Sequence, residues 1–179
     1  MKININYVLD DICKDWACKI NRQISQLTLN QINFLKGGCR PHITLLMGEI
    51  NEADLPKINE IISTMNFKAL NTKIDFCKLY CKGPYIFVDV KDYSAFKEDC
   101  DNLLKSLGNL IVPHKYLISN GNPPHITLGF VQEQEKIENY LKTINHVPST
   151  ILKKVTVSQT GPHGTVICEQ KLNQYKKEL

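Results

Sequence analysis

The pentapeptide Pro-His-Ile-Thr-Leu occurs twice in this chain, at residues 41–45 and again at residues 124–128. This duplication constrains the fold more than any other feature, because self-similarity within a chain indicates that one structural unit has been built twice. The two copies lie about 80 residues apart, which leaves room for one structural repeat between them. We therefore interpret the rest of the chain as a scaffold that brings the two copies face to face.

The expected elements recur in the same order around each copy: helix, loop, strand with the pentapeptide, helix, strand and strand. Apolar spacing predicts helices over about 12–24, 55–65, 96–107 and 137–144, and strands over about 3–7, 42–49, 70–81, 85–91, 125–130, 151–159 and 164–170. The expected fold class is α+β, a duplicated two-lobed fold with two antiparallel-type sheets around a pseudo-twofold axis and helices on the outside. We expect a single bilobal domain over residues 1–179, with lobes built from about 1–91 and 92–179 and a frayed tail from residue 171.

Histidine and threonine stand two residues apart in each copy, so in a strand their side chains point to the same face. Strict alternation places His42, Thr44 and Leu46 opposite Ile43, Leu45 and Met47. In the second copy the same rule places His125, Thr127 and Gly129 opposite Ile126, Leu128 and Phe130. Each strand is therefore expected to present one imidazole and one hydroxyl on the face opposite a buried apolar row.

Two facing histidines can divide the work of general acid–base catalysis. The neutral one takes a proton from an attacking hydroxyl or water, and the protonated one gives a proton to the departing oxygen, which suits imidazole because its ordinary pKa is about 6.5. The threonine hydroxyls would donate hydrogen bonds to phosphate oxygens. A single His-x-Thr motif carries little information, whereas two identical copies in a repeat favour a catalytic pair. The alternative is that duplication copied a structural segment with both histidines in the core.

The paired motifs, each on an expected strand of a two-lobed α+β fold, resemble those of the 2H phosphoesterase superfamily. That group includes 2′-5′ RNA ligase-like proteins, 2′,3′-cyclic nucleotide phosphodiesterases and 2′,5′-oligoadenylate phosphodiesterases. The resemblance spans nearly the whole chain, and both copies match the family pattern. It implies metal-independent cleavage of a 2′-linked or cyclic nucleotide phosphodiester, such as a 2′,5′-oligonucleotide or a 2′,3′-cyclic phosphate, without a cofactor. It also implies that His42 and His125 are the acid–base pair and that Thr44 and Thr127 bind the phosphate.

Three alternative functions stay open: hydrolysis of cyclic oligonucleotide messengers in defence evasion, nucleotide or RNA binding without catalysis, and 2′-5′ RNA ligation. All of these ligands present the same phosphate to the same four side chains, so the motifs do not choose among them. The net charge of +4 is compatible with a phosphate-bearing ligand and far from a polybasic arm. The lack of an appended basic domain favours a nucleotide or short oligonucleotide as the substrate.

Three further residues are candidates for substrate binding. The turn Lys-Gly-Pro-Tyr over 82–85 ends at Tyr85, and the corresponding turn Gly-Pro-His-Gly over 161–164 contains His163. By this correspondence both residues could flank the site, and Tyr85 could stack on a base. Arg40 directly precedes the first copy and could contact phosphate, although a solvated loop charge is the default interpretation. No third carboxylate or cysteine ligand has a suitable spacing beside the two motif histidines, so we expect no metal.

The cysteine content bears on the compartment. The seven cysteines are odd in number and show no CxxC spacing, which indicates reduced thiols in a cytoplasmic protein. The N-terminal residues contain no long apolar run, so we expect no signal peptide. No segment approaches the ~20 apolar residues of a membrane span. We separately expect the protein to be a monomer.

Overall fold

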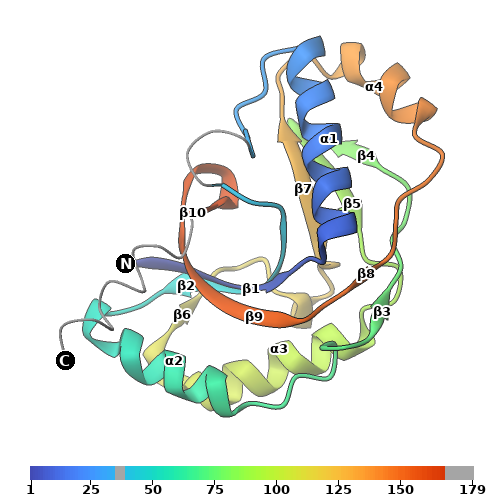
Figure 1. Ribbon diagram of the computed structural model, residues 1–179. Helices are drawn as coiled ribbons and strands as arrows, with labels where there is room; N and C mark the ends of the chain where they lie inside the picture. Colours follow the sequence, from blue (N-terminus) through green and yellow to red (C-terminus); the bar gives the residue numbers. More distant parts are fainter. Residues whose placement is uncertain (35–38, 168–179) are drawn as a thin grey trace.

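The computed structural model describes residues 1–34 and 39–167, which form four α-helices and three antiparallel sheets (Figure 1). The helices are α1 (Asp11–Leu27), α2 (Leu55–Thr64), α3 (Ser94–Leu107) and α4 (Gln134–Thr143). The strands are β1 (Lys2–Val8), β2 (His42–Glu49), β3 (Lys73–Ile74), β4 (Tyr80–Lys82), β5 (Tyr85–Asp89), β6 (Val112–Pro113), β7 (His125–Phe130), β8 (Thr150–Ile151), β9 (Lys154–Thr160) and β10 (Val166–Ile167). The expected tail from residue 171 and the end of the last expected strand lie outside the described residues.

The sheets place the two pentapeptide strands in different layers. The largest sheet has five strands in the order β10-β9-β1-β2-β6, and a second sheet has three in the order β4-β5-β7. A two-stranded sheet pairs β3 with β8. Helices α2 and α3 lie against the five-stranded sheet, and α1 and α4 lie against the three-stranded sheet (Figure 1). The α+β class with antiparallel sheets is therefore confirmed.

The expected division into lobes of about 1–91 and 92–179 does not describe the sheets. Strand β5 from the first half pairs with β7 from the second, and β9 from the second half pairs with β1 from the first. The two halves do share a β-α-β arrangement in which β1 precedes α1 and β2, and β5 precedes α3 and β7. The pseudo-twofold duplication itself stays a prediction.

A β-bulge interrupts each pentapeptide strand at the same position. In the pairing of β1 with β2, Leu45 is an extra residue between the partners of Ile5 and Asn6. In the pairing of β5 with β7, Leu128 is the extra residue in the same way. A bulge places two successive side chains on one side and so inverts the alternation that follows. The expected faces are therefore wrong beyond the bulge.

Burial shows the inversion directly. Leu45 and Leu46 are both buried at 1% exposure, whereas Met47 is half-buried on the histidine side of the strand. In the second strand Gly129 is buried with Leu128, and Phe130 moves to the face of His125 and Thr127. The bulge thus adds an aromatic ring to the polar face of the second motif.

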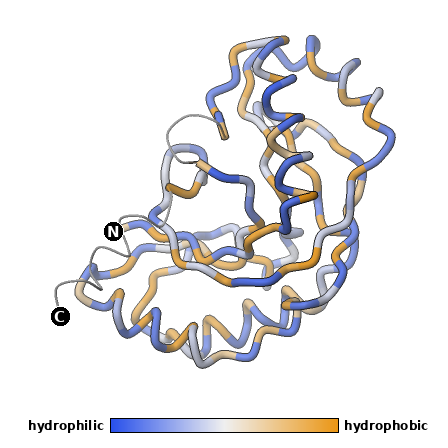
Figure 2. Tube along the Cα trace, viewed as in Figure 1, coloured by the Kyte–Doolittle hydropathy of each residue, from blue (hydrophilic) through white to orange (hydrophobic). Residues whose placement is uncertain are grey.

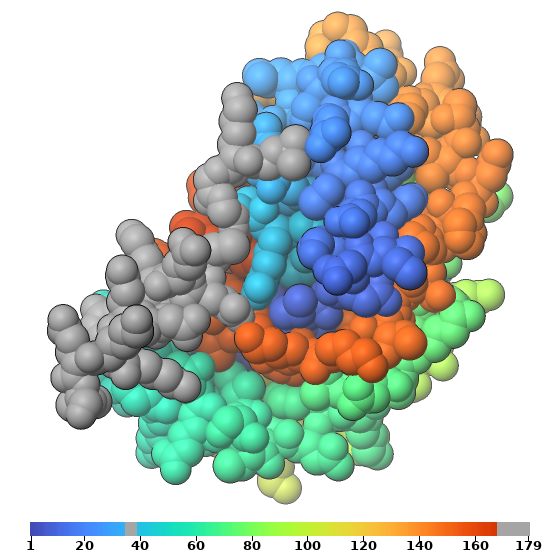
Figure 3. Space-filling model, in the orientation of Figure 1, coloured from blue at the N-terminus to red at the C-terminus, as the bar shows by residue number. Residues whose placement is uncertain are grey.

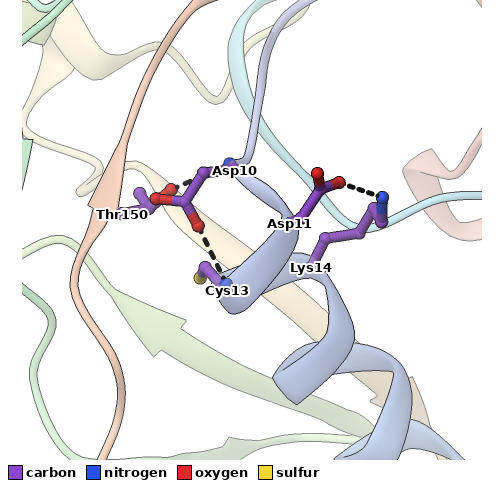
Figure 4. A network of polar contacts seen from close by, with 5 residues as sticks. All are labelled: Asp10, Asp11, Cys13, Lys14 and Thr150. Carbon is purple, nitrogen blue, oxygen red and sulfur yellow. Dashed lines mark hydrogen bonds and ion pairs between the residues drawn. The ribbon is translucent and has the colours of Figure 1, made fainter.

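The start of α1 is fixed by the capping residue that its sequence predicts. Asp10 accepts a hydrogen bond from the backbone N–H of Cys13 at 2.9 Å, as N-cap aspartates do (Figure 4). The backbone N–H of Asp10 also donates to the Thr150 hydroxyl at 3.1 Å. This contact ties the entrance of α1 to β8. Asp11 and Lys14 form an exposed ion pair one turn along, which contributes little to stability.

One hydrophobic core runs through both layers of the molecule, and part of it lies between the five-stranded sheet and helices α2 and α3. Tyr7 on β1 is fully buried, and its ring meets that of Phe96 on α3 edge-on at 5.2 Å between centroids. Apolar segments gather along the strands and the inner faces of the helices (Figure 2). Burying each such large side chain contributes roughly 1.5–3 kcal/mol, so this layer holds the five-stranded sheet in place.

One expected strand is broken. The run over 70–81 forms only β3 and β4, separated by a segment in which Phe76 makes an isolated bridge to Val90. Asn71 adopts a left-handed backbone with φ of 59°, which interrupts the extended conformation at the start of this run.

Within the described residues, no helix has both the length and the apolar character needed to cross a membrane.

Candidate active site

Both motif histidines are oriented by the same backbone contact. Nδ1 of His42 lies 3.0 Å from the carbonyl oxygen of Arg40, and Nδ1 of His125 lies 3.0 Å from the carbonyl oxygen of Pro123. A carbonyl oxygen only accepts hydrogen bonds, so Nδ1 carries the proton in each ring. The Nε2 atom of each neutral ring is therefore the one left to accept a proton. The structure gives the two copies the same tautomer by the same device.

The two rings also influence each other electrostatically. Strands β2 and β7 are in contact although they belong to different sheets. The positive charge that His125 can carry lowers the pKa of His42, so the protonation states of the two rings are coupled. Both rings are half-buried and neither is sealed in the core. The structure thus brings together the two histidines that the sequence singles out.

Burial shifts both histidines toward their neutral forms. It is the main reason that the pKa of His42 is lowered to about 4, and the charges of Arg40 and His125 lower it further. Burial also lowers the pKa of His125, but there the carboxylate of Asp89 opposes the shift. Asp89 stands directly across from His125 in the pairing of β5 with β7. The two copies therefore have different electrostatic surroundings.

The neutral state of His42 predicts a loss of stability in mild acid. Its folded-state pKa lies below the ordinary value of 6.5, so the unfolded chain binds the proton more tightly. The contribution of neutral His42 to the free energy of unfolding is fully present above pH 6.5. As the pH falls toward 4, the free energy of unfolding decreases by on the order of 2 kcal/mol. Urea unfolding at pH 7.5, 6.0 and 5.0 will measure it.

The matched variant for this prediction is His42→Gln, which cannot titrate. We expect its unfolding free energy to fall less than that of the wild type between pH 6.5 and 5. Carboxylates with a lowered pKa, such as Asp92, lose their contribution only at lower pH and do not disturb this window. If the unfolding free energies of the two proteins fall equally with pH in this range, His42 does not have the lowered pKa described above.

A buried polar network lies beneath the first motif. Asn4 of β1, which is fully buried, donates from Nδ2 to the Thr44 hydroxyl at 2.9 Å and faces Nε2 of His42 at 3.4 Å. Asn6 continues the network, since its side chain contacts the Asn4 carbonyl oxygen and the Ser158 hydroxyl. The first motif therefore rests on amides and hydroxyls from neighbouring strands.

An aromatic cluster surrounds the second motif instead. The ring of Phe87 lies 4.2 Å from that of His125, and Tyr85 stacks on Phe87 at 5.4 Å between centroids. Phe130, which the bulge turns to this face, meets Tyr85 edge-on at 4.9 Å and stacks on His163 at 3.9 Å. The half of the site that carries His125 is thus apolar and flat-sided.

His163 reaches this cluster through an unusual turn. Its backbone is left-handed with φ of 58°, a conformation that residues other than glycine seldom adopt and that often marks functional positions. Its Nε2 donates to the side-chain oxygen of Gln31 at 2.9 Å. The rings of His163 and Tyr85 lie near one another, with centroids 6.4 Å apart. The expectation that both residues flank the site stays a prediction, as does their role in binding.

Arg40 is not a freely solvated loop charge. Its guanidinium donates to the Thr156 hydroxyl of β9 at 2.7 Å, and the side chain is half-buried. It lies near enough to His42 to lower the pKa of that ring. Figure 3 shows part of the cyan segment around the start of β2 uncovered between α1 in blue and β9 in orange-red. Contact of Arg40 with phosphate stays a prediction.

Sequence reasoning missed Asn4, Phe87 and Phe130 as neighbours of the motifs. Asn4 belongs to the polar face of β1, which a single sequence assigns to solvent, and Phe130 needs the bulge to reach its position. Among residues 1–34 and 39–167, no group of three or more His, Cys, Asp or Glu side chains is placed to hold a metal ion. A hollow of about 440 Å³ between β4 and α4, lined by Tyr80, Glu138 and Lys142, lies apart from the histidines.

Comparison with known proteins gives the class of fold. No protein-family model matches this chain, and no curated protein matches it in sequence. Among solved structures, the chain is similar to the PDE (phosphodiesterase) domain of MHV ns2, with a TM-score of 0.50 and 16% sequence identity. The match covers 73% of this chain and 78% of that domain. The fold that the resemblance to the 2H phosphoesterases predicts is therefore confirmed, and at this level of identity the likeness shows the fold alone.

Proposed function

We propose that this protein is a metal-independent phosphodiesterase of the 2H type that cleaves a 2′-linked or cyclic nucleotide phosphodiester. The observation that carries the proposal is the matched pair of histidines. Each is held through Nδ1 by a carbonyl two residues earlier, and each stands beside a motif threonine. The likeness in fold to a phosphodiesterase domain supports the reaction class.

The proposed chemistry uses the four motif side chains around one phosphorus. One histidine accepts a proton from the attacking hydroxyl or water at Nε2 while the new O–P bond forms. The other donates a proton to the departing oxygen as its bond to phosphorus breaks, and each transfer contributes about 10²–10⁴-fold. Thr44 and Thr127 donate to the non-bridging oxygens, where charge develops. The phosphate anion raises the pKa of both rings, which supplies the protonated partner from a site that is otherwise neutral.

The aromatic cluster favours a nucleotide over a phosphate ester without a base. Flat aromatic faces are surfaces on which a nucleobase stacks, typically with about 1–3 kcal/mol per base. Tyr85, Phe130 and His163 lie against one another on the side of His125, next to the place where the phosphate would sit. We infer that the base binds there, with Arg40 on the opposite, polar side of the phosphate.

Removing the Tyr85 ring is expected to weaken substrate binding more than it slows chemistry. For Tyr85→Ala we expect KM to rise about 5- to 100-fold, because a stacked base is lost, while kcat changes little. Tyr85→Phe is the matched control, since it keeps the stacking face and should retain the wild-type KM. A KM that is unchanged in Tyr85→Ala would place the base elsewhere.

A product analysis over a panel of substrates tests the proposal. The panel contains 2′,5′-linked oligoadenylate, 2′,3′-cyclic nucleotides, cyclic oligonucleotides and 3′,5′-linked RNA, each incubated with EDTA. We expect cleavage of a 2′-linked or 2′,3′-cyclic member, and the position of the phosphate in the product fixes which bond breaks. Lack of cleavage of every member would overturn the proposed reaction.

The same panel separates the alternative functions. Cleavage of cyclic oligonucleotides alone would favour a role in removing messengers in defence evasion. Tight binding of a 2′-phosphorylated ligand without product would favour a nucleotide or RNA binder, and net joining of RNA ends would favour a 2′-5′ RNA ligase. From its cysteine content we further infer a cytoplasmic location, which cell fractionation will check. We also expect a monomer, which gel filtration will check.

A further inference from the structure

Asn4 connects three parts of the site through one nitrogen atom. Its Nδ2 donates to Thr44 Oγ1 at 2.9 Å and lies 3.4 Å from His42 Nε2 and 3.5 Å from the carbonyl oxygen of Gly164. Gly164 belongs to the turn that carries His163. The side chain is fully buried, and its Oδ1 has no hydrogen-bond partner among the described residues. An unpaired buried acceptor is costly, so a structural purpose alone does not account for this amide.

The neighbours of Asn4 determine which way its amide faces. The Gly164 carbonyl can only accept, and Nε2 of His42 also accepts because Nδ1 already donates to the Arg40 carbonyl. Rotating the amide would set its oxygen against these acceptors. The NH₂ group of Asn4 therefore faces His42. This contact favours the neutral ring, because a proton on Nε2 of the charged ring would point at the NH₂ group, which is itself a donor.

The same contact orients the Thr44 hydroxyl. Because Thr44 Oγ1 accepts a hydrogen bond from Asn4, its own hydrogen is directed away from the amide. The hydroxyl is then free to donate to a phosphate oxygen beside His42. One buried amide thus contacts both side chains of the first motif, where it favours the neutral form of the ring and directs the hydrogen of the hydroxyl outward.

The second motif lacks this arrangement. The matching bulges align Asn4 with Tyr85 and Asn6 with Phe87, so aromatic rings occupy the positions that amides occupy beneath the first motif. Asp89 faces His125 across the strands and stabilises a positive ring, while Lys82 acts in the opposite sense. His125 is therefore the histidine that can hold a proton more readily.

We propose that Asn4 is a positioning residue that keeps His42 neutral, and that it thereby makes His42 the general base and His125 the general acid. This inference rests on the proposed phosphodiesterase function for the two roles, but the effect of Asn4 on His42 does not. The other groups acting on His42 are the carbonyl and the charge of Arg40 two residues before it, the charge of His125 on β7 and the Gly164 carbonyl in the turn after β9. The two carbonyls favour the protonated ring, and the two charges favour the neutral one. Removing Asn4 leaves these in place.

NMR titration of the His42 ring in wild type and Asn4→Leu tests the inference without any substrate. Leucine fills a similar volume but cannot donate, so the neutral ring loses a stabilising contact and the proton affinity of His42 should rise by about tenfold. Ser158→Ala is the control, because Ser158 is buried in the same polar network, accepts a hydrogen bond from Asn6 and lies on β9, two strands away from His42. We expect its His42 titration to match that of the wild type.

A second measurement needs no variant and applies even where Asn4→Leu does not fold. Nitrogen chemical shifts of the wild-type ring at pH 7 should show a neutral His42 with its proton on Nδ1 and a hydrogen-bonded, accepting Nε2. A proton on Nε2, or equal His42 titrations in wild type and folded Asn4→Leu, would overturn the inference.

With a cleaved substrate in hand, the roles themselves become measurable. The acid limb of the kcat/KM profile reports the base of the free enzyme, so it should move to higher pH in Asn4→Leu together with the His42 titration. Movement of the alkaline limb with the His42 titration would reverse the assigned roles. If His42 responds to Asn4 but no substrate is cleaved, the proposed function fails while the positioning stands.

Discussion

Replacing either motif histidine by alanine is expected to lower kcat for phosphodiester cleavage by about 10³–10⁴-fold. The reason is that His42 and His125 act on the same phosphorus, so neither proton transfer proceeds efficiently when one Nε2 is missing. The double variant should be little slower than either single one, because residues that act as a unit are not additive. Single-turnover rates with the best substrate of the panel will measure this.

The control for this prediction is His146→Ala, since His146 is exposed and remote in sequence from both motifs. It should retain the wild-type rate. Circular dichroism will establish that each variant is folded. A folded His42→Ala or His125→Ala that cleaves at the wild-type rate would rule out the paired-histidine mechanism.

The largest effect on stability is expected from Asp99→Ala. The carboxylate of Asp99 is buried on α3 and accepts three hydrogen bonds, from the backbone N–H groups of Lys68 and Ala69 at 2.7 and 2.9 Å and from the Tyr7 hydroxyl at 2.5 Å. Alanine would leave all three donors without their acceptor. We expect the free energy of unfolding to fall by about 3–5 kcal/mol, measured by urea denaturation.

Tyr7→Phe separates the loss of one donor from the loss of the acceptor. It removes a single hydrogen bond and keeps the ring against Phe96, so we expect a cost of only about 1 kcal/mol. Nearly equal costs for Tyr7→Phe and Asp99→Ala would show that the two backbone contacts contribute nothing. This network also connects α3 to β1, the strand that carries Asn4.

Local patterns predicted most elements correctly because their causes are local. Helical apolar spacing and the Asp10 cap placed α1, and alternation placed the strands that begin at His42 and His125. The pairing of the two motifs across the molecule was predicted from their repetition alone.

The features that sequence reasoning missed depend on contacts between distant segments. A bulge is a property of two paired strands, so nothing within residues 41–45 shows that Leu45 and Leu46 share a face. The burial of Asn4 depends on its contacts with Thr44 and the turn at Gly164, which no local pattern encodes. For the same reason the exchange of strands between halves was not predicted.

That exchange has a consequence for how the chain can be divided. A cut near residue 91 would give two fragments, and each of the three sheets would lack strands that reside on the other fragment. Neither piece could hide its apolar faces without the other. Phosphodiesterase activity would then return only when the two fragments associate. The loop near residue 91 is therefore a suitable site for dividing the protein into a split-enzyme reporter.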